Sequence, residues 1–262
     1  MSYISDFISS PISLFGVHGG VTTNDPSTAT LTGTKFYTGD DRVVVLVQNG
    51  GSALVSGVLV QSPASVGANH TGLTLSTAAI GATQITATLG GTAVYANEYA
   101  GGYLVISAGT GKGQTLKIAS HPAQSSTTGT VVLTLEDPLS VATATADSKG
   151  SLTLPQYGSK NGVDVSTRGV VISPTTATGR TIGVTLYPIP ASTATVPSYG
   201  YIVCNGPVAC LNDSGTAIGL DVMPSSAVAG AVVTHVVATR NRVGTSTVAG
   251  ENTKNQLITL QL

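Results

Sequence analysis

The glycine-rich segment Gly109–Gln114 comes nearest to a known catalytic or nucleotide-binding pattern in this chain. A phosphate-binding loop requires a glycine five residues before the glycine of its Gly-Lys pair, and a serine or threonine after the lysine, because backbone amides and a hydroxyl must surround phosphate and magnesium. Here Ile106 takes the glycine position and Gly113 follows Lys112. The glycine spacing also fails the dinucleotide-binding pattern. The segment therefore predicts a tight hairpin loop without a bound cofactor.

The histidines and carboxylates are too scattered to suggest a shared site. No histidine has a neighbour at metal-ligand spacing; the four are His18, His70, His121 and His235. Asp40-Asp41 and Glu136-Asp137 are adjacent pairs, and adjacent residues of a strand point to opposite faces, so neither pair converges for acid–base chemistry. We expect both pairs at turns, with a calcium site at Asp40-Asp41 as an alternative. These patterns predict a protein that is not an enzyme and holds no metal or cofactor.

Cys204 and Cys210 are the only cysteines. One pair cannot form a disulfide framework, and without a nearby histidine it does not form a zinc site. The residues between them include Gly206-Pro207, which could turn the chain and bring the thiols together. We expect two buried, reduced thiols, with a disulfide as the alternative.

Charged residues make up only 9% of the 262 residues, compared with about 25% in an ordinary soluble domain. The net charge is −1 and the lysines and arginines are scattered singly, so no basic stripe is available to bind nucleic acid. No apolar run reaches the roughly 18 residues of a membrane-spanning helix, and residues 1–17 lack the basic start of a signal peptide. So few charges give little mutual repulsion, which favours a protein held in an assembly; a robust secreted β protein is the alternative.

The abundance of Val, Thr, Gly and Pro predicts an all-β protein with two or three small sandwich- or barrel-like units, short loops and few or no helices. Residues 41–48 form an apolar run that stops at Asn49-Gly50-Gly51, which predicts a hairpin with residues 54–60 as the returning strand. Strands are also expected at 103–107 and 114–119, and at 257–262, where Ile258 and Leu260 share one face. The predicted segments are an N-terminal arm with a β unit (1–90), a central β unit containing the glycine-rich hairpin (91–160) and a C-terminal β unit (161–262), with a linker in 156–169.

Two parts of the chain resemble a family of structural proteins of marine and cyanobacterial tailed phages, encoded beside the major capsid gene. The first part carries the sequences at Tyr99–Tyr103, Gly109–Gln114, His121-Pro122 and Leu135–Leu139. The second carries those at Tyr201–Leu211, Met223–Ser226 and Ala229–Ala231. The resemblance implies a virion protein that decorates or cements the outer capsid surface, and it supplies no functional residues.

This resemblance sets the expected partners and location. The protein would be made in the bacterial host cytoplasm, which keeps thiols reduced, and would bind the major capsid protein on the outer surface of the virion. Copies around a symmetry axis would most simply form trimers, with dimers as the alternative. No nucleic acid, membrane or cofactor is expected. A tail-tube or tail-fibre subunit and a carbohydrate-binding adhesion module remain as alternative functions.

Two groups of apolar residues are the candidate contact sites. The N-terminal segment could add a strand to a neighbour's sheet; its candidate residues are Ile4, Phe7, Ile8, Leu14 and Phe15. An edge strand within this chain is the alternative for that segment. Tyr95, Tyr99 and Tyr103 recur every four residues, which in a strand places them on one face. We interpret them as core or interface tyrosines, with a glycan-binding platform as the alternative.

Overall fold

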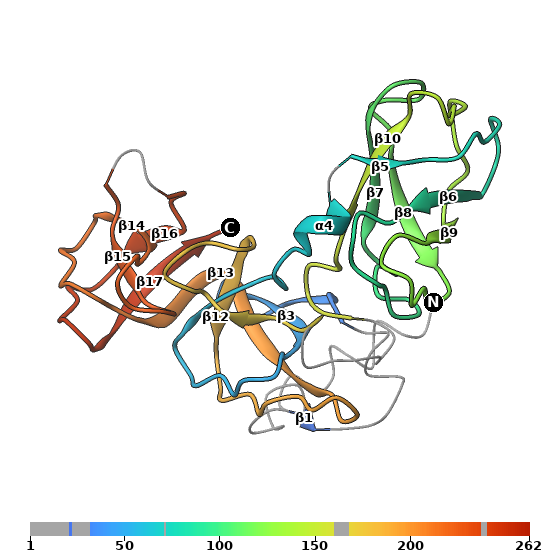
Figure 1. Cartoon of the computed structure of the whole chain (residues 1–262). Coiled ribbons are helices and arrows are strands. Elements are labelled where there is room, and N and C mark those ends of the chain that lie inside the picture. Colours follow the sequence, from blue (N-terminus) through green and yellow to red (C-terminus); the bar gives the residue numbers. More distant parts are fainter. Residues whose placement is uncertain (1–20, 23–31, 71, 160–167, 237–239) are drawn as a thin grey trace.

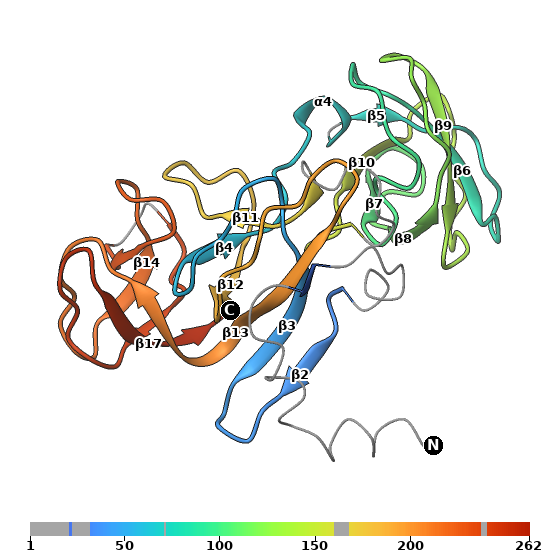
Figure 2. The same cartoon turned by 90° about the horizontal axis from the view of Figure 1, so that it is seen from below.

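The computed structural model describes residues 21–22, 32–70, 72–159, 168–236 and 240–262. Nearly all of its regular structure is β, which confirms the predicted all-β class. The helix α4 (Gly67–His70) has four residues, and no helix in the described ranges has the length and apolar character needed to span a membrane. The strands form two antiparallel sheets, which lie toward opposite ends of the molecule in both views (Figures 1 and 2).

The smaller sheet, which we call the barrel unit, has six strands in the order β5-β10-β7-β8-β9-β6. Their bounds are β5 (Leu73–Thr74), β6 (Gln84–Thr88), β7 (Tyr103–Ala108), β8 (Thr115–Ser120), β9 (Thr130–Leu135) and β10 (Lys149–Thr153). The sheet is nearly closed, because Leu75 after β5 bridges Ala87 of β6. Alternate residues of β7, β8 and β9 point inward and form one apolar core, as the period of two in these segments predicts.

The larger sheet has eleven strands and curves into a half-barrel. Its N-terminal strands are β1 (Val21–Thr22), β2 (Lys35–Tyr37), β3 (Val43–Gln48) and β4 (Leu59–Gln61). Its C-terminal strands are β11 (Val171–Ile172), β12 (Thr181–Thr185), β13 (Ser198–Leu211), β14 (Asp221–Pro224), β15 (Val232–Thr234), β16 (Gly244–Ser246) and β17 (Asn255–Gln261). β3 is buried on both faces, with Val44 in one apolar cluster and Val45 and Val47 in another, which explains its continuous apolar sequence.

β13 is the long strand that joins the two halves of this sheet. Its first half pairs with β3 and β12, and its second half pairs with β17. The register shifts between Val203 and Asn205, and Gly206 has a φ of 97°. A Cβ at Gly206 would lie 2.3 Å from the carbonyl oxygen of Asp41, so only glycine permits this approach.

The strand pairing does not follow the predicted segments 1–90, 91–160 and 161–262. Residues 73–153 form the barrel unit, which is inserted between β4 and β11 of the larger sheet. The predicted boundary between residues 90 and 91 falls at a turn inside the barrel unit, where Gly91 N donates to Thr127 O. Two sheets thus draw on three stretches of sequence.

The predicted hairpin at Asn49-Gly50-Gly51 is wrong. β3 pairs with β2 and β13, while β4 pairs with β11 and β12. The side chain of Asn49 is fully buried, and its Nδ2 donates to the carbonyl oxygens of Ser52 (2.9 Å) and Pro190 (2.7 Å). Leu54 then bridges Ile189, so the chain crosses to a distant segment instead of returning beside β3.

Candidate functional site

The three tyrosines predicted to share a strand face do not do so. Tyr95 lies before a turn that runs to Gly101, and Asn97 in that turn has a φ of 58°. Tyr99 is fully buried in the core of the barrel unit, whereas Tyr95 and Tyr103 are 49% and 45% exposed. The prediction of one shared face is wrong because a turn, not a strand, connects them. The other candidate residues, Ile4, Phe7, Ile8, Leu14 and Phe15, lie outside the described residues.

His121 holds the turn that contains Tyr99. Its Nε2 accepts a hydrogen bond from the backbone N–H of Tyr99 (2.9 Å), and its Nδ1 lies 2.9 Å from the carbonyl oxygen of Pro122. This pattern requires a neutral ring with the proton on Nδ1. Burial lowers the pKa of His121, partly offset by the bond to Pro122, and burial together with the nearby charge of Glu98 raises the pKa of Tyr99. His121 is thus a structural residue.

A buried ion pair joins the barrel unit to the chain that enters β11. Arg168 Nη2 lies 2.7 Å from Glu98 Oε1, and the two side chains are 13% and 1% exposed. Glu98 Oε2 also accepts a hydrogen bond from Tyr95 N (2.9 Å). Arg168 Nε has no partner among the described residues. No sequence pattern predicts this pair, although Glu98 is a lone glutamate in a weakly charged, tyrosine-rich segment and could have been noted.

The carboxylates singled out in the sequence lie at turns. Asp40 accepts from Thr38 and Arg42, and the hydrogen bond from Arg42 lowers the pKa of Asp40 to about 2. Glu136 pairs with Lys117 at 2.7 Å. Within the described ranges, no group of three His, Cys, Asp or Glu side chains could hold a metal ion.

The glycine-rich segment is the hairpin loop between β7 and β8, as predicted. It packs on the loop before β10, where Thr110 N donates to Asp147 Oδ2 (3.0 Å). A Cβ at Gly109 would lie 2.2 Å from the carbonyl oxygen of Asp147. The side chain of Gln114 accepts from Val141 N (3.1 Å) and donates to Val141 O (2.9 Å). These contacts explain the glycines without a ligand.

Cys204 and Cys210 are both buried free thiols, as expected. The alternative that a turn brings them together is wrong, because both lie in the continuous strand β13. Six residues of extended chain span roughly 20 Å, whereas a disulfide needs Cα atoms within about 7 Å. They also belong to different apolar clusters of the larger sheet.

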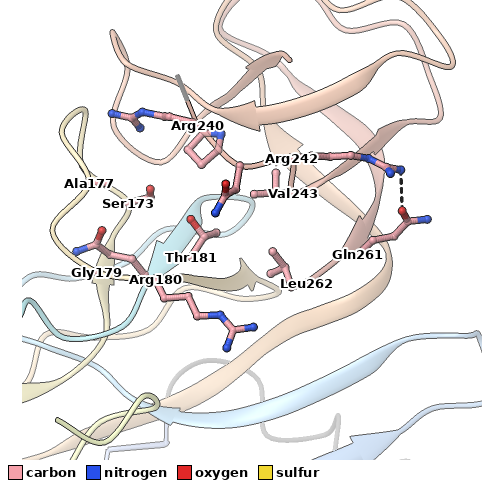
Figure 3. A pocket seen from close by; sticks show the side chains of 13 residues that line it. Ser173, Ala177, Gly179, Arg180, Thr181, Arg240, Arg242, Val243, Gln261 and Leu262 are labelled. Atoms are coloured by element: carbon pink, nitrogen blue, oxygen red, sulfur yellow. Dashed lines mark hydrogen bonds between the residues drawn. The ribbon is translucent and has the colours of Figure 1, made fainter. Parts of the chain in front are cut away.

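A pocket of about 530 Å³ at the C-terminal end of the larger sheet is lined by three of the five arginines (Figure 3). Arg240 donates to the carbonyl oxygens of Ser225 (2.9 Å) and Thr175, and Arg242 pairs with Asp221 (2.9 Å). Figure 3 shows the guanidinium groups of Arg180, Arg240 and Arg242 pointing away from one another. Arg240 and Arg242 therefore bind neighbouring segments of this chain and do not converge on a ligand.

A second cavity, which we call the interdomain cleft, measures about 570 Å³ and lies between the barrel unit and the larger sheet. The barrel unit contributes Tyr103, Lys117 and Thr153, and the segment after β10 contributes Gln156 and Tyr157. The larger sheet contributes residues 32–34 before β2, Ser62 after β4 and Arg180 before β12. The described residues that line the cleft include no Asp or Glu. Its side chains are thus aromatic, hydroxyl, amide and basic, with the aliphatic Leu154 and Pro155 beside them.

A weakly charged outer surface, which we call the threonine–leucine face, covers the outward side of β13, β17 and β16. Cross-strand pairing places Ala209 beside Leu257, and Thr259 between Pro207 and Thr245. Leu257 is 37% exposed, and its carbonyl oxygen accepts from the N–H of Val248, which is 49% exposed. The ion pair of Arg242 with Asp221 borders one corner. Apart from that corner, the polar groups of the face are hydroxyl and amide groups, and such a surface can contact another protein.

Comparison with models of protein families, with curated proteins and with solved structures gives no match.

Proposed function

We propose that this chain is a structural protein of a tailed-phage virion that decorates the outer surface of the capsid and cements the major capsid protein lattice. The threonine–leucine face is the observation that carries the proposal. A surface of paired β-strands with exposed Leu257 and Val248, whose charged groups are confined to the corner where Arg242 and Asp221 bind Thr245, loses little solvation when covered. The resemblance of residues 87–139 and 201–231 to phage structural proteins points in the same direction.

Cementing of this kind works by many weak contacts. Each copy would bridge neighbouring capsid subunits, and the multiplicity of copies gives strength that no single contact supplies. Self-association around a symmetry axis, with trimers favoured and dimers as the alternative, adds to this multiplicity. The N-terminal segment 1–17 is a second proposed contact, in which a strand from one copy pairs with the sheet edge of a neighbour.

The first test is the number of copies of this polypeptide in purified virions, measured by quantitative mass spectrometry. Hundreds of copies per particle are expected for a protein that follows the capsid lattice. A few copies would favour a tail-fibre part, and its absence from particles would refute a virion role.

The second test measures occupancy of capsids by added protein. Leu257→Lys places a charge in the threonine–leucine face and should reduce occupancy at least about tenfold, since burying an unpaired charge costs several kcal/mol. Val132→Lys is the matched control, because Val132 is similarly exposed (40%) but lies on β9 of the barrel unit. Equal occupancy for the two variants would refute the face. Deletion of residues 1–17 tests the arm in the same assay, and unchanged occupancy would exclude it.

A further inference from the structure

We propose that the interdomain cleft binds a saccharide that carries a carboxylate. This inference concerns a different surface from the threonine–leucine face and does not rest on the proposed virion role. Its volume of about 570 Å³ lies within the range of small-molecule sites, which is roughly 300–1,000 Å³. The cleft can therefore hold sugar rings, and it is larger than a lone carboxylate requires.

Two tyrosines supply the aromatic surface. Tyr103 starts β7 and is 45% exposed, and its backbone N–H donates to Thr153 Oγ1 (3.0 Å), which fixes the start of the strand. Tyr157 is half-buried, and its ring packs against the backbone of Gly33, where a Cβ would lie 3.1 Å from Cδ2. Tyrosine combines a flat apolar ring with a hydroxyl, which suits a sugar whose ring has C–H groups on its face and hydroxyls at its edge.

Arg180 supplies the positive charge. It is exposed, lines the cleft and makes no side-chain hydrogen bond or ion pair with the residues that the structure describes. Lys35 at the start of β2 adds a second charge near the same place: burial raises the pKa of Tyr157, and the charges of Lys35 and Arg180 act against that rise. A guanidinium binds a carboxylate through two parallel hydrogen bonds.

The other polar groups match sugar hydroxyls and leave the charge of Arg180 free for a ligand. Thr34, Ser62 and Gln156 line the cleft and offer hydroxyl and amide groups, and the buried Oγ1 of Thr32 has no partner among the described residues. Lys117 at the rim already pairs with Glu136.

A carboxylate fits this cleft better than a phosphate does. Phosphate sites are usually built from several backbone N–H groups at a helix N-terminus or in a glycine-rich nest. No described helix borders the cleft, since its lining residues lie in strands and in the segments that join them. One free guanidinium can bind the carboxylate of a uronate or sialate ring, and the hydroxyls and aromatic rings of the cleft can contact the hydroxyls and the C–H groups of that ring.

The binding test is calorimetric titration of the full chain with three acidic probes: tri-galacturonate, a hyaluronan tetrasaccharide and 3′-sialyllactose. At least one is expected to bind with a Kd below about 1 mM. The methyl ester of tri-galacturonate keeps the rings and removes the charge, and acetate keeps the charge without the rings. Because hydrogen bonds to charged groups contribute about 1.5–3 kcal/mol, that is roughly tenfold or more in Kd, the ester should bind at least about tenfold more weakly than its acid, and acetate should not bind.

Variants locate the binding. Arg180→Gln and Tyr103→Ala should each weaken the best probe at least about tenfold while leaving the melting temperature near that of the parent. Tyr95→Ala is the matched control, because Tyr95 is similarly exposed but does not line the cleft. The proposal is overturned if no acidic probe binds, if acid and ester bind equally, if Arg180→Gln keeps full affinity, or if AMP or an acidic peptide binds more tightly than every saccharide.

Discussion

Replacing Arg168 with methionine is expected to destabilise the protein by about 3–5 kcal/mol, because the Glu98 carboxylate is left buried without a compensating charge. Glu98 is 1% exposed and Arg168 is 13% exposed, so little water reaches either group to replace the lost partner. Methionine keeps most of the length of the arginine stem and therefore limits the cavity that the substitution creates. The cost thus measures the charge and not the packing.

The exposed pair of Lys117 and Glu136 provides the matched control. Its N–O distance is 2.7 Å, the same as that of the buried pair, but its side chains are 34% and 43% exposed. Lys117→Met should therefore cost less than about 1 kcal/mol. The comparison separates burial from distance, since the two pairs have the same N–O distance and differ strongly in burial.

The assay is urea denaturation followed by circular dichroism, because urea does not screen charges as guanidinium chloride does. The double variant Arg168→Met with Glu98→Gln should recover much of the lost stability. A neutral amide then replaces the buried carboxylate, and the amide oxygen can still accept from Tyr95 N. If Arg168→Met and Lys117→Met cost the same, or if the double variant is no more stable than Arg168→Met, the reasoning about the buried charge is refuted.

Three further predictions concern single sites. Gly109→Ala should lower the free energy of unfolding by about 1–3 kcal/mol, because the φ of Gly109 is 75° and a Cβ there would meet the Asp147 carbonyl. Gly113→Ala should cost clearly less, because Gly113 also has a positive φ (94°) but a Cβ there would meet open space. Thermal melts compare the two variants, and equal losses of stability would contradict the contact. Burial lowers the pKa of His121 below its usual 6.5, so the unfolded chain binds a proton that the folded chain does not, and stability should fall as pH drops below about 6.5. In urea titrations at several pH values, His121→Gln should reduce this dependence of stability on pH. An unchanged pH dependence would contradict the role of His121. Burial raises the pKa of Cys210 to about 12 and also raises that of Cys204, so neither thiol should react with a disulfide reagent at about pH 8 in the native protein, and both should react in urea; rapid native labelling would contradict the burial of that thiol.

Local sequence patterns predicted the strands whose partners are near in sequence. The strands expected at 103–107 and 114–119 correspond to β7 and β8, which are joined by the glycine loop. Ile258 and Leu260 are fully buried on one face of β17, as their alternation indicated. In these segments the period of two and the turn residues carry enough information, because burial on one face sets the pattern.

Patterns of the same kind failed where distant contacts decide the structure. Asn49-Gly50 reads as a hairpin turn, but the buried amide of Asn49 binds the carbonyl oxygen of Pro190, 141 residues away. The spacing of Tyr95, Tyr99 and Tyr103 reads as a strand face, but Asn97 adopts a positive φ and turns the chain. Nothing in a local window shows which of two turn geometries the rest of the fold will stabilise.

The interdomain cleft was beyond prediction for the same reason. No spacing relates its residues, which come from 32–34, Ser62, Gly101, Tyr103, Lys117, 153–158 and Arg180. They meet only because the barrel unit is inserted between β4 and β11. The sequence shows only the residue types that line the cleft, namely tyrosines and a few charged residues, and not that they lie together.

The position of the buried ion pair makes the two proposals separable. The Glu98–Arg168 pair fastens the turn that ends at Gly101 to the chain entering β11, and Gly101 and Tyr103 line the cleft. Loss of Arg168 should therefore loosen the cleft and weaken saccharide binding together with stability, because a site built from two units needs both in place. Leu257 lies on β17, away from this junction, so Leu257→Lys should change capsid occupancy and leave saccharide affinity intact. A Leu257→Lys variant that lowered capsid occupancy and saccharide affinity equally would mean that the face and the cleft are one surface.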